Sequence, residues 1–260
     1  MSRVVLILAG LLLWVTPASG QIAFQSATTS AEAASATGIT FSHTVSSGSN
    51  LALVVGLTYR DNAGAAPSTV TATYNGVSMT LLGHTGRVNQ VGAAIWCLAN
   101  PATGPNDVVI TIDQTVDLLR GGAIGFTGVD QTTPCEAGNT ATGASLTPTI
   151  TITTVTDNSW VVDSLYSKSG NATVTGSGQV ERWNGTVNAG ADDTGGSTFG
   201  PKTPAGAHSM DWSNNGESTN WALAGAAVKP ATTAGAARRR VYVTRTMPGA
   251  LPTRTKGEGK

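Results

Sequence analysis

Residues 49–60 read SNLALVVGLTYR, and residues 51–57 within them form the longest unbroken apolar run beyond the N-terminal segment. A short apolar run bounded by Ser and Asn on one side and by a Gly/Ala/Asn/Pro loop on the other is typical of a buried strand. We therefore expect the fold to be built around this strand.

The segments on either side of this run predict further strands. Residues 39–45 (ITFSHTV) and 70–74 (VTATY) alternate apolar with polar side chains, which is the period of a half-buried strand. Asn75-Gly76 follows directly, and both residues tolerate the positive φ of a tight turn, so we expect a hairpin that returns over residues 77–82. A second such turn is expected at Asn184-Gly185.

Similar strand patterns continue to residue 228, separated by turns every 8 to 15 residues, and no segment has a convincing helical period. Charged residues make up 12% of the chain and aromatic residues 5%, while Gly, Ala, Ser and Thr are abundant. This composition suits strands with short turns. We expect an all-β fold, a two-sheet antiparallel β-sandwich of jelly-roll type with about 10–12 strands.

The N-terminal residues 1–20 have the pattern of a signal peptide. Arg3 precedes an apolar stretch over residues 4–15, and Pro17-Ala18-Ser19-Gly20 offers small residues for cleavage. The stretch is shorter than the roughly 20 residues that span a bilayer, which argues against a transmembrane anchor. We expect a secreted chain, extracellular or at the cell surface, with a sandwich over residues 21–230.

The net charge of zero conceals an asymmetry. Residues 21–230 hold seven basic and fourteen acidic side chains, whereas residues 231–260 hold seven basic and one acidic. We interpret residues 231–260 as a basic flexible tail. The run Arg238-Arg239-Arg240 could attract an anionic polymer, but no aromatic interleaving or known motif accompanies it, so no specific nucleic-acid partner is expected.

The chain has two cysteines, Cys97 and Cys135. In an exported protein an even pair favours a disulfide, which would close a loop of about 38 residues and stabilise the fold by roughly 3 to 4 kcal/mol. The alternative is two reduced cysteines buried as small apolar side chains.

A family resemblance follows from the order of several segments. These are SHTVSSGSNLALVVGLT (42–58), VTATYNGVSMTLL (70–82), AIWCLANPATGPNDVVITI (94–112), AIGFTGVDQTTP (123–134), SWVVDSLY (159–166) and WALAGAAVKP (221–230). Together they resemble an uncharacterised β-sandwich domain common in predicted exported bacterial proteins and in some phage and environmental proteins. The resemblance implies one domain over residues 22–230, and it carries no catalytic residue or ligand with it.

Candidate site residues come from the loops. Trp183 and Trp212 lie beside polar turn residues, so they are candidates for a sugar-stacking surface, with burial in the core as the alternative. Asp192 and Asp193 are adjacent, and a loop could direct both toward calcium, the one cofactor that the sequence leaves open. Solvated loop carboxylates are the alternative.

Patterns for catalysis are weak. The three histidines are far apart, no G-x-S-x-G turn is present, and no paired carboxylates stand two residues apart on one strand. The main hypothesis is therefore a secreted non-catalytic module with a structural or adhesive role, whose partner is a polysaccharide, a cell surface or other copies of itself. A carbohydrate-binding module is the second hypothesis, and a glycan-active hydrolase is the third.

Overall fold

The computed structural model describes residues 20–136 and 138–232, so the expected signal peptide and basic tail lie almost entirely outside the described residues. The elements are β1 (Ala23–Thr29), β2 (Ala33–Val45), β3 (Ala52–Arg60), β4 (Val70–Tyr74), β5 (Val77–Ser78), β6 (Thr80–His84), β7 (Val91–Ala99), β8 (Gly104–Thr127), β9 (Asn139–Ser145), β10 (Thr149–Thr153), β11 (Ser159–Ser167), β12 (Thr173–Val174), β13 (Val180–Val187), the 3-10 turn η1 (Asn188–Gly190), β14 (Asp192–Lys202), β15 (Ala207–Ser213) and β16 (Thr219–Val228). All strand pairs are antiparallel, and the expected all-β sandwich is confirmed.

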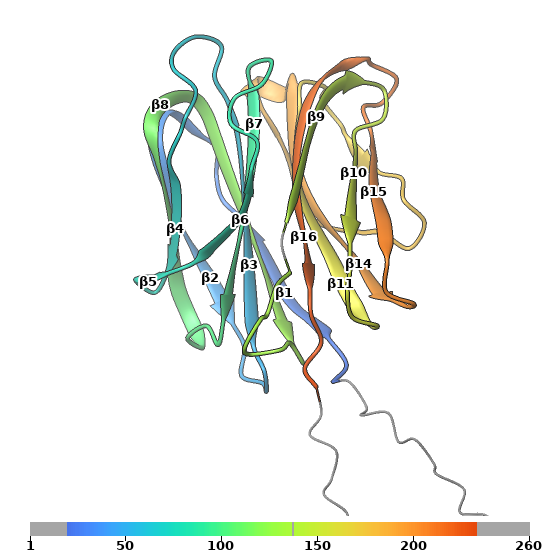
Figure 1. Ribbon diagram of the computed structural model, residues 1–260. Coiled ribbons are helices and arrows are strands. Elements are labelled where there is room, and N and C mark those ends of the chain that lie inside the picture. Colours follow the sequence, from blue (N-terminus) through green and yellow to red (C-terminus); the bar gives the residue numbers. More distant parts are fainter. Residues whose placement is uncertain (1–19, 137, 233–260) are drawn as a thin grey trace, which may run out of the picture.

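The strands form four stacked layers, which Figure 1 shows from left to right. The first two layers belong to one eight-stranded sheet that folds over itself along the long strand β8. Residues 108–112 of β8 pair with β4, and residues 118–126 pair with β3. A cluster of buried side chains, including Leu53, Tyr74 and Trp96, fills the space between these two halves.

The third layer is the five-stranded sheet β13-β14-β11-β16-β9, which packs against the β3–β7 half of the curled sheet. The fourth is the small sheet β10-β15-β12, which covers the other face of the third layer over Ile150, Trp212 and Leu223. The expected two-sheet sandwich therefore forms the centre, and a flanking layer on each side brings the described strands to sixteen rather than 10–12.

The central run is buried because both of its faces lie inside cores. Residues 52–59 are all buried, with Leu53, Val55 and Leu57 facing the core inside the curled sheet and Val54 facing the third layer. A strand with no solvent face needs no alternation of polar residues. This explains why the sequence reads as an uninterrupted apolar run.

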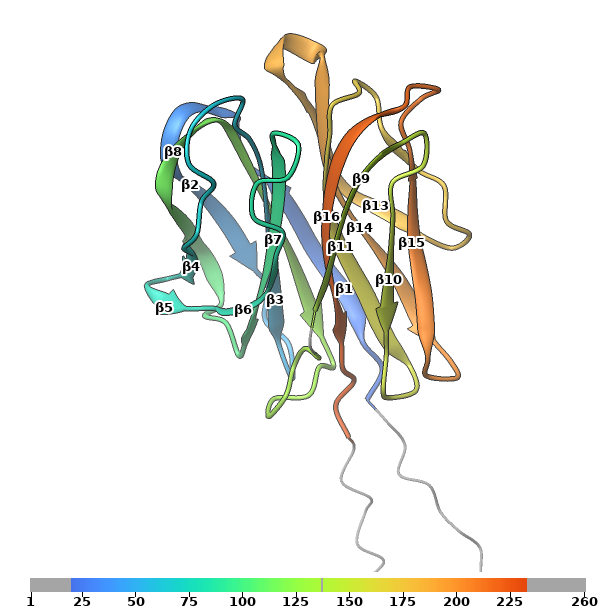
Figure 2. The same cartoon turned by 45° about the horizontal axis from the view of Figure 1, so that its top comes forward.

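The two ends of the described chain lie side by side. The amide of Gly20 donates to the carbonyl of Ala231, and the amide of Ala231 donates to Gly128. Figures 1 and 2 place this point at the bottom of the molecule, which we call the base. The opposite end, which we call the rim, includes the connections over residues 30–32, 61–69, 85–90, 146–148, 168–172, 188–191 and 214–218.

Two of the local expectations have opposite outcomes. The hairpin at Asn75-Gly76 is confirmed, because both residues have positive φ and Tyr74 pairs with Val77. The turn expected at Asn184-Gly185 is wrong, since both residues lie inside β13 and pair with Gly195 and Thr194. A Cβ at position 185 would lie 2.2 Å from the Arg120 guanidinium, so this glycine makes room for an arginine.

The disulfide is confirmed. Cys97 of β7 is bonded to Cys135, and the segment around Cys135 bridges Val228 at the end of β16. The bond therefore ties the loop after β8 to the second layer beside the base. Within the described residues, no helix has the length and apolar character that a membrane crossing requires.

Candidate functional site

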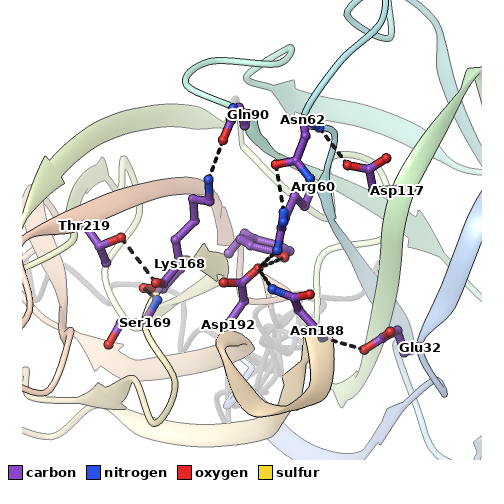
Figure 3. Close-up of polar contacts among 12 residues, drawn as sticks. Glu32, Arg60, Asn62, Gln90, Asp117, Lys168, Ser169, Asn188, Asp192 and Thr219 are labelled. Atoms are coloured by element: carbon purple, nitrogen blue, oxygen red, sulfur yellow. Dashed lines mark hydrogen bonds and ion pairs between the residues drawn. The ribbon is translucent and has the colours of Figure 1, made fainter.

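A polar network at the rim joins the second and third layers (Figure 3). The Oδ2 atom of Asp192 accepts three hydrogen bonds: from Arg60 Nη1 at 2.7 Å, from the Tyr166 hydroxyl at 2.9 Å and from Asn188 Nδ2 at 3.2 Å. The Asp192 side chain is 5% exposed and that of Arg60 17%. The charge of the buried carboxylate is thus balanced by one cation and two neutral donors.

Each member stands where a strand meets the rim. Arg60 is the last residue of β3, Asp192 is the first of β14, and Asn188 belongs to η1 just before it. Tyr166 lies one residue before the end of β11 and extends from the third layer toward Arg60. Removing one partner of such a buried pair typically costs about 3 to 5 kcal/mol, because the other charge is left unpaired.

Further polar contacts fix the surrounding loops. The amide of Asn62 donates to Asp117 at 2.8 Å, and the amide of Asn188 donates to Glu32 at 2.9 Å. The Lys168 amine donates to the side-chain oxygen Oε1 of Gln90, and this bond links the β6–β7 loop to the end of β11 (Figure 3). Loops from both sheets are therefore held to one another rather than left independent.

The electrostatics keep the Tyr166 hydroxyl neutral and the Arg60 guanidinium charged. Burial, and then the charge of Asp192, raises the pKa of Tyr166, so its hydroxyl remains a donor. Burial opposes the charge on Arg60, but its hydrogen bond and ion pair with Asp192 raise the pKa of the guanidinium above its ordinary value. Neither group titrates near neutral pH, so the arrangement suits a fixed contact better than a general acid and base. We call Arg60, Tyr166, Asn188 and Asp192 together the clamp.

Asp192 and Asp193 are not brought together. They are neighbours in β14, so their side chains point to opposite faces of the sheet. Asp192 joins the clamp, whereas Asp193 accepts the amide of Thr194, and burial raises the pKa of Asp193 to about 6. Within residues 20–136 and 138–232, no group of three or more His, Cys, Asp or Glu is placed to hold a metal ion.

Trp183 and Trp212 are buried at 5% and 0% exposure, which corrects the expectation that their rings form a sugar-stacking surface. Trp183 fits between Gly122 and Gly196, where a Cβ on either glycine would come within 2.2 Å of the ring. The Trp212 indole donates to Asp163 at 2.7 Å inside the core between the third and fourth layers. Both rings are covered because small residues face them.

Sequence reasoning missed the residues that form the clamp. Arg60 and Asp192 are 132 positions apart, and Tyr166 and Asn188 lie in segments with no recognisable motif. A weak signal existed at Arg60, since a charge directly after a buried strand marks the point where the chain reaches solvent. Nothing local indicated its partner.

Comparisons with known proteins add no relatives: no protein-family model matches the chain, and no curated protein or solved structure is significantly similar to it. The family resemblance seen in the sequence therefore stays a prediction. The functional argument rests on the residues themselves.

Proposed function

We propose that this protein is an exported, non-catalytic β-sandwich that serves as a structural or adhesive module at the cell surface and contacts its partner through the rim. The single observation that carries this proposal is the placement of the chain ends and the loops. The hydrogen bond between Gly20 and Ala231 puts both ends of the described chain at the base, and the Arg60–Asp192 clamp holds the loops together at the opposite end. A module tethered at its base presents its rim outward.

Export is supported by the Cys97–Cys135 bond, because disulfides persist mainly in oxidising compartments outside the cytosol. The N-terminal pattern of residues 1–20 points the same way. The basic composition of residues 231–260 adds a segment that would be attracted to anionic surfaces.

Side chains cover several strand edges, which favours contact through loops over edge-to-edge pairing. Arg120 donates to the carbonyls of Ser30 and Thr186, and so bridges the β1–β2 connection and β13. Asn139 donates to the carbonyl of Thr151 on β10, and Ser26 donates to that of Thr44 on β2. The proposal therefore assigns the partner to the loops of the rim.

The test is to pass the full chain over a panel of immobilised polysaccharides and cell-wall preparations while assaying the eluate for new reducing ends. The proposal expects retention on at least one surface without release of sugar. Release of reducing ends that disappears when a single acidic residue is substituted would identify a hydrolase and contradict the proposal. Absence of retention on every surface would contradict the adhesive role.

A further inference from the structure

Three strand irregularities meet near the base, at the seam between the second and third layers. The pairing register shifts between Phe24 and Ser26 in β1, around Trp160 in β11, and around Arg182 in β13. The described strand pairs contain five such shifts, so three of the five fall at this one place. Bulges often redirect side chains and occur frequently beside functional sites.

The bulge in β13 directs Arg182 toward the second layer. Its neighbour Trp183 points into the same core, although adjacent residues of a regular strand would point to opposite faces. The extra residue of the bulge allows both side chains to face the second layer, Trp183 toward Gly56 and Gly122 and Arg182 toward Phe24. The guanidinium then lies 3.9 Å from the centroid of the Phe24 ring and 5.9 Å from that of Trp160.

The guanidinium is held in place while its terminal nitrogens stay unengaged. Arg182 Nε donates to Thr198 Oγ1 at 2.7 Å, and the cation–π contact with Phe24 fixes the plane of the group. Among the described residues, no hydrogen bond or ion pair is recorded for its two terminal nitrogens. Burial lowers the pKa of Arg182, and a bound anion would offset this cost of desolvation.

The other cations of the described residues are already engaged. Three of them form ion pairs: Arg60 with Asp192, Arg87 with Asp61, and Lys229 with Asp130. The other three donate hydrogen bonds to oxygen atoms: Arg120 to Ser30 and Thr186, Lys168 to Gln90, and Lys202 to Pro204. Arg182 is therefore the cation whose fork remains available for an external ligand. Two parallel N–H donors of this kind match a carboxylate.

A small hollow lies next along the same strands. It has a volume of about 200 Å³ and is lined by Gly20, Gln21, Ile22, Asn158 and Pro201. Pro201 follows Gly200, where a Cβ would lie 2.4 Å from the Trp160 ring, so the hollow adjoins Trp160. Its volume lies below the roughly 300 to 1,000 Å³ of drug-sized pockets, so it suits one ring of a longer chain.

We propose that Arg182, held by Phe24 and Trp160, binds the carboxylate groups of an acidic polysaccharide built from uronic acids. The guanidinium takes the carboxylate with its two terminal nitrogens, and the neighbouring hollow takes part of a sugar unit. This site lies near the base and is separate from the rim, so it does not depend on the proposed function. An acidic polypeptide is the competing ligand that the experiment distinguishes.

The experiment measures binding of the full chain to immobilised polygalacturonate, to its methyl ester and to poly-L-glutamate. The proposal expects binding to polygalacturonate, and loss of binding when esterification removes the carboxylate charge. Arg182→Gln is expected to weaken binding by about tenfold or more, because it removes the paired donors. Arg182→Lys keeps the charge without the fork, and a smaller, few-fold loss is expected.

Lys202→Gln serves as the matched control, because it removes one positive charge near the base and its amine contacts only the Pro204 carbonyl. Its affinity is expected to equal that of the unchanged chain, and circular dichroism with thermal unfolding verifies that each variant is folded. Equal affinity of Arg182→Gln and the unchanged chain would overturn the proposal. No binding to polygalacturonate, or equally strong binding to poly-L-glutamate, would overturn the assignment of the ligand.

Discussion

Arg60 and Asp192 are 132 positions apart in the chain, yet Arg60 Nη1 lies 2.7 Å from Asp192 Oδ2 and joins the two central sheets at the rim. The pair is mostly buried, and Tyr166 and Asn188 donate to the same carboxylate oxygen. The stability of the rim therefore depends on a contact that forms only when both sheets are complete.

Arg60→Leu is expected to lower the free energy of unfolding by about 3 kcal/mol, because it leaves a buried carboxylate without its cation. Asp192→Leu should cost a similar amount. The double variant Arg60→Leu/Asp192→Leu should be clearly more stable than the sum of the two losses implies, since no unpaired charge remains. Urea denaturation of all four proteins measures the coupling, and additive losses would show that the two residues act independently.

The disulfide makes a separate contribution at the base. Replacing both Cys97 and Cys135 by Ser should lower the free energy of unfolding by about 3 to 4 kcal/mol, because the bond closes a 38-residue separation in the unfolded chain. The measurement is guanidinium denaturation of the oxidised chain and of the double variant. An unchanged midpoint would contradict the contribution, and an intact mass without the loss of two hydrogens would contradict the bond itself.

Asp163 should make the protein more stable as the pH falls. Its carboxylate is fully buried and accepts hydrogen bonds from Ser197 and Trp212, and burial raises its pKa to about 6 from an ordinary value of 3.8. Between these two values the folded state binds a proton that the unfolded state does not. Relative to Asp163→Asn, the unchanged chain should therefore gain about 2 kcal/mol from pH 7 to pH 4.

Urea denaturation of both proteins at several pH values measures this difference. The variant is expected to be less stable at every pH, because an amide has two hydrogens where the site supplies only donors. The pH dependence of the difference is the informative quantity. A flat difference between pH 7 and pH 4 would contradict the raised pKa.

His43 should act in the opposite direction. Its ring is buried between Thr28 and Ser26, and burial lowers its pKa to about 4 from 6.5. The unfolded chain therefore takes up a proton below about pH 6.5 that the folded chain refuses until about pH 4. Relative to His43→Gln, the unchanged chain should lose stability over this interval. A gain over the same interval would show that the folded state holds a charged ring.

Trp183 should behave as a core residue. Its ring fills the space between two glycines, so Trp183→Ala should lower the free energy of unfolding by about 3 to 5 kcal/mol, and Trp183→Phe should cost less. Thermal or urea denaturation measures both losses. A Trp183→Ala variant of unchanged stability would indicate an exposed ring and would restore the sugar-stacking hypothesis.

The parts of the fold that depend on local chemistry could be predicted. The apolar run around Val54 and the turn at Asn75-Gly76 follow from burial and from tolerance of positive φ, and both appear as expected. Strand β14 could not be predicted, because small residues stand where the Trp183 and Trp212 rings need room. A Cβ on Gly195 or Gly196 would come within 2.6 Å of the Trp212 or Trp183 ring, so the strand carries glycines where a strand pattern requires larger side chains.

The clamp could not be predicted from the sequence in the same way. Arg60 and Asp192 lie on strands of different sheets, since β3 pairs with β8 and β14 pairs with β11. Their contact therefore depends on the strand register within each sheet and on how the two sheets pack. Likewise, Arg182 reaches Phe24 only because β13 contains a bulge, and no residue near the bulge indicates it in the sequence. The positions of these side chains depend on the pairing register of strands that are far apart in the sequence, and no short segment determines that register.

The central claim is that the rim contacts the partner through a surface separate from the Arg182 site near the base, and site-specific attachment tests it most directly. Ala65→Cys at the rim and Thr103→Cys in the exposed turn before β8 at the base each provide one attachment point for beads. Beads carrying the chain by Thr103→Cys should be retained on a polysaccharide or cell-wall surface that binds the free protein and its Arg182→Gln variant equally, and beads carrying it by Ala65→Cys should pass through. Equal retention in both orientations, or retention only with the rim attached, would contradict the account.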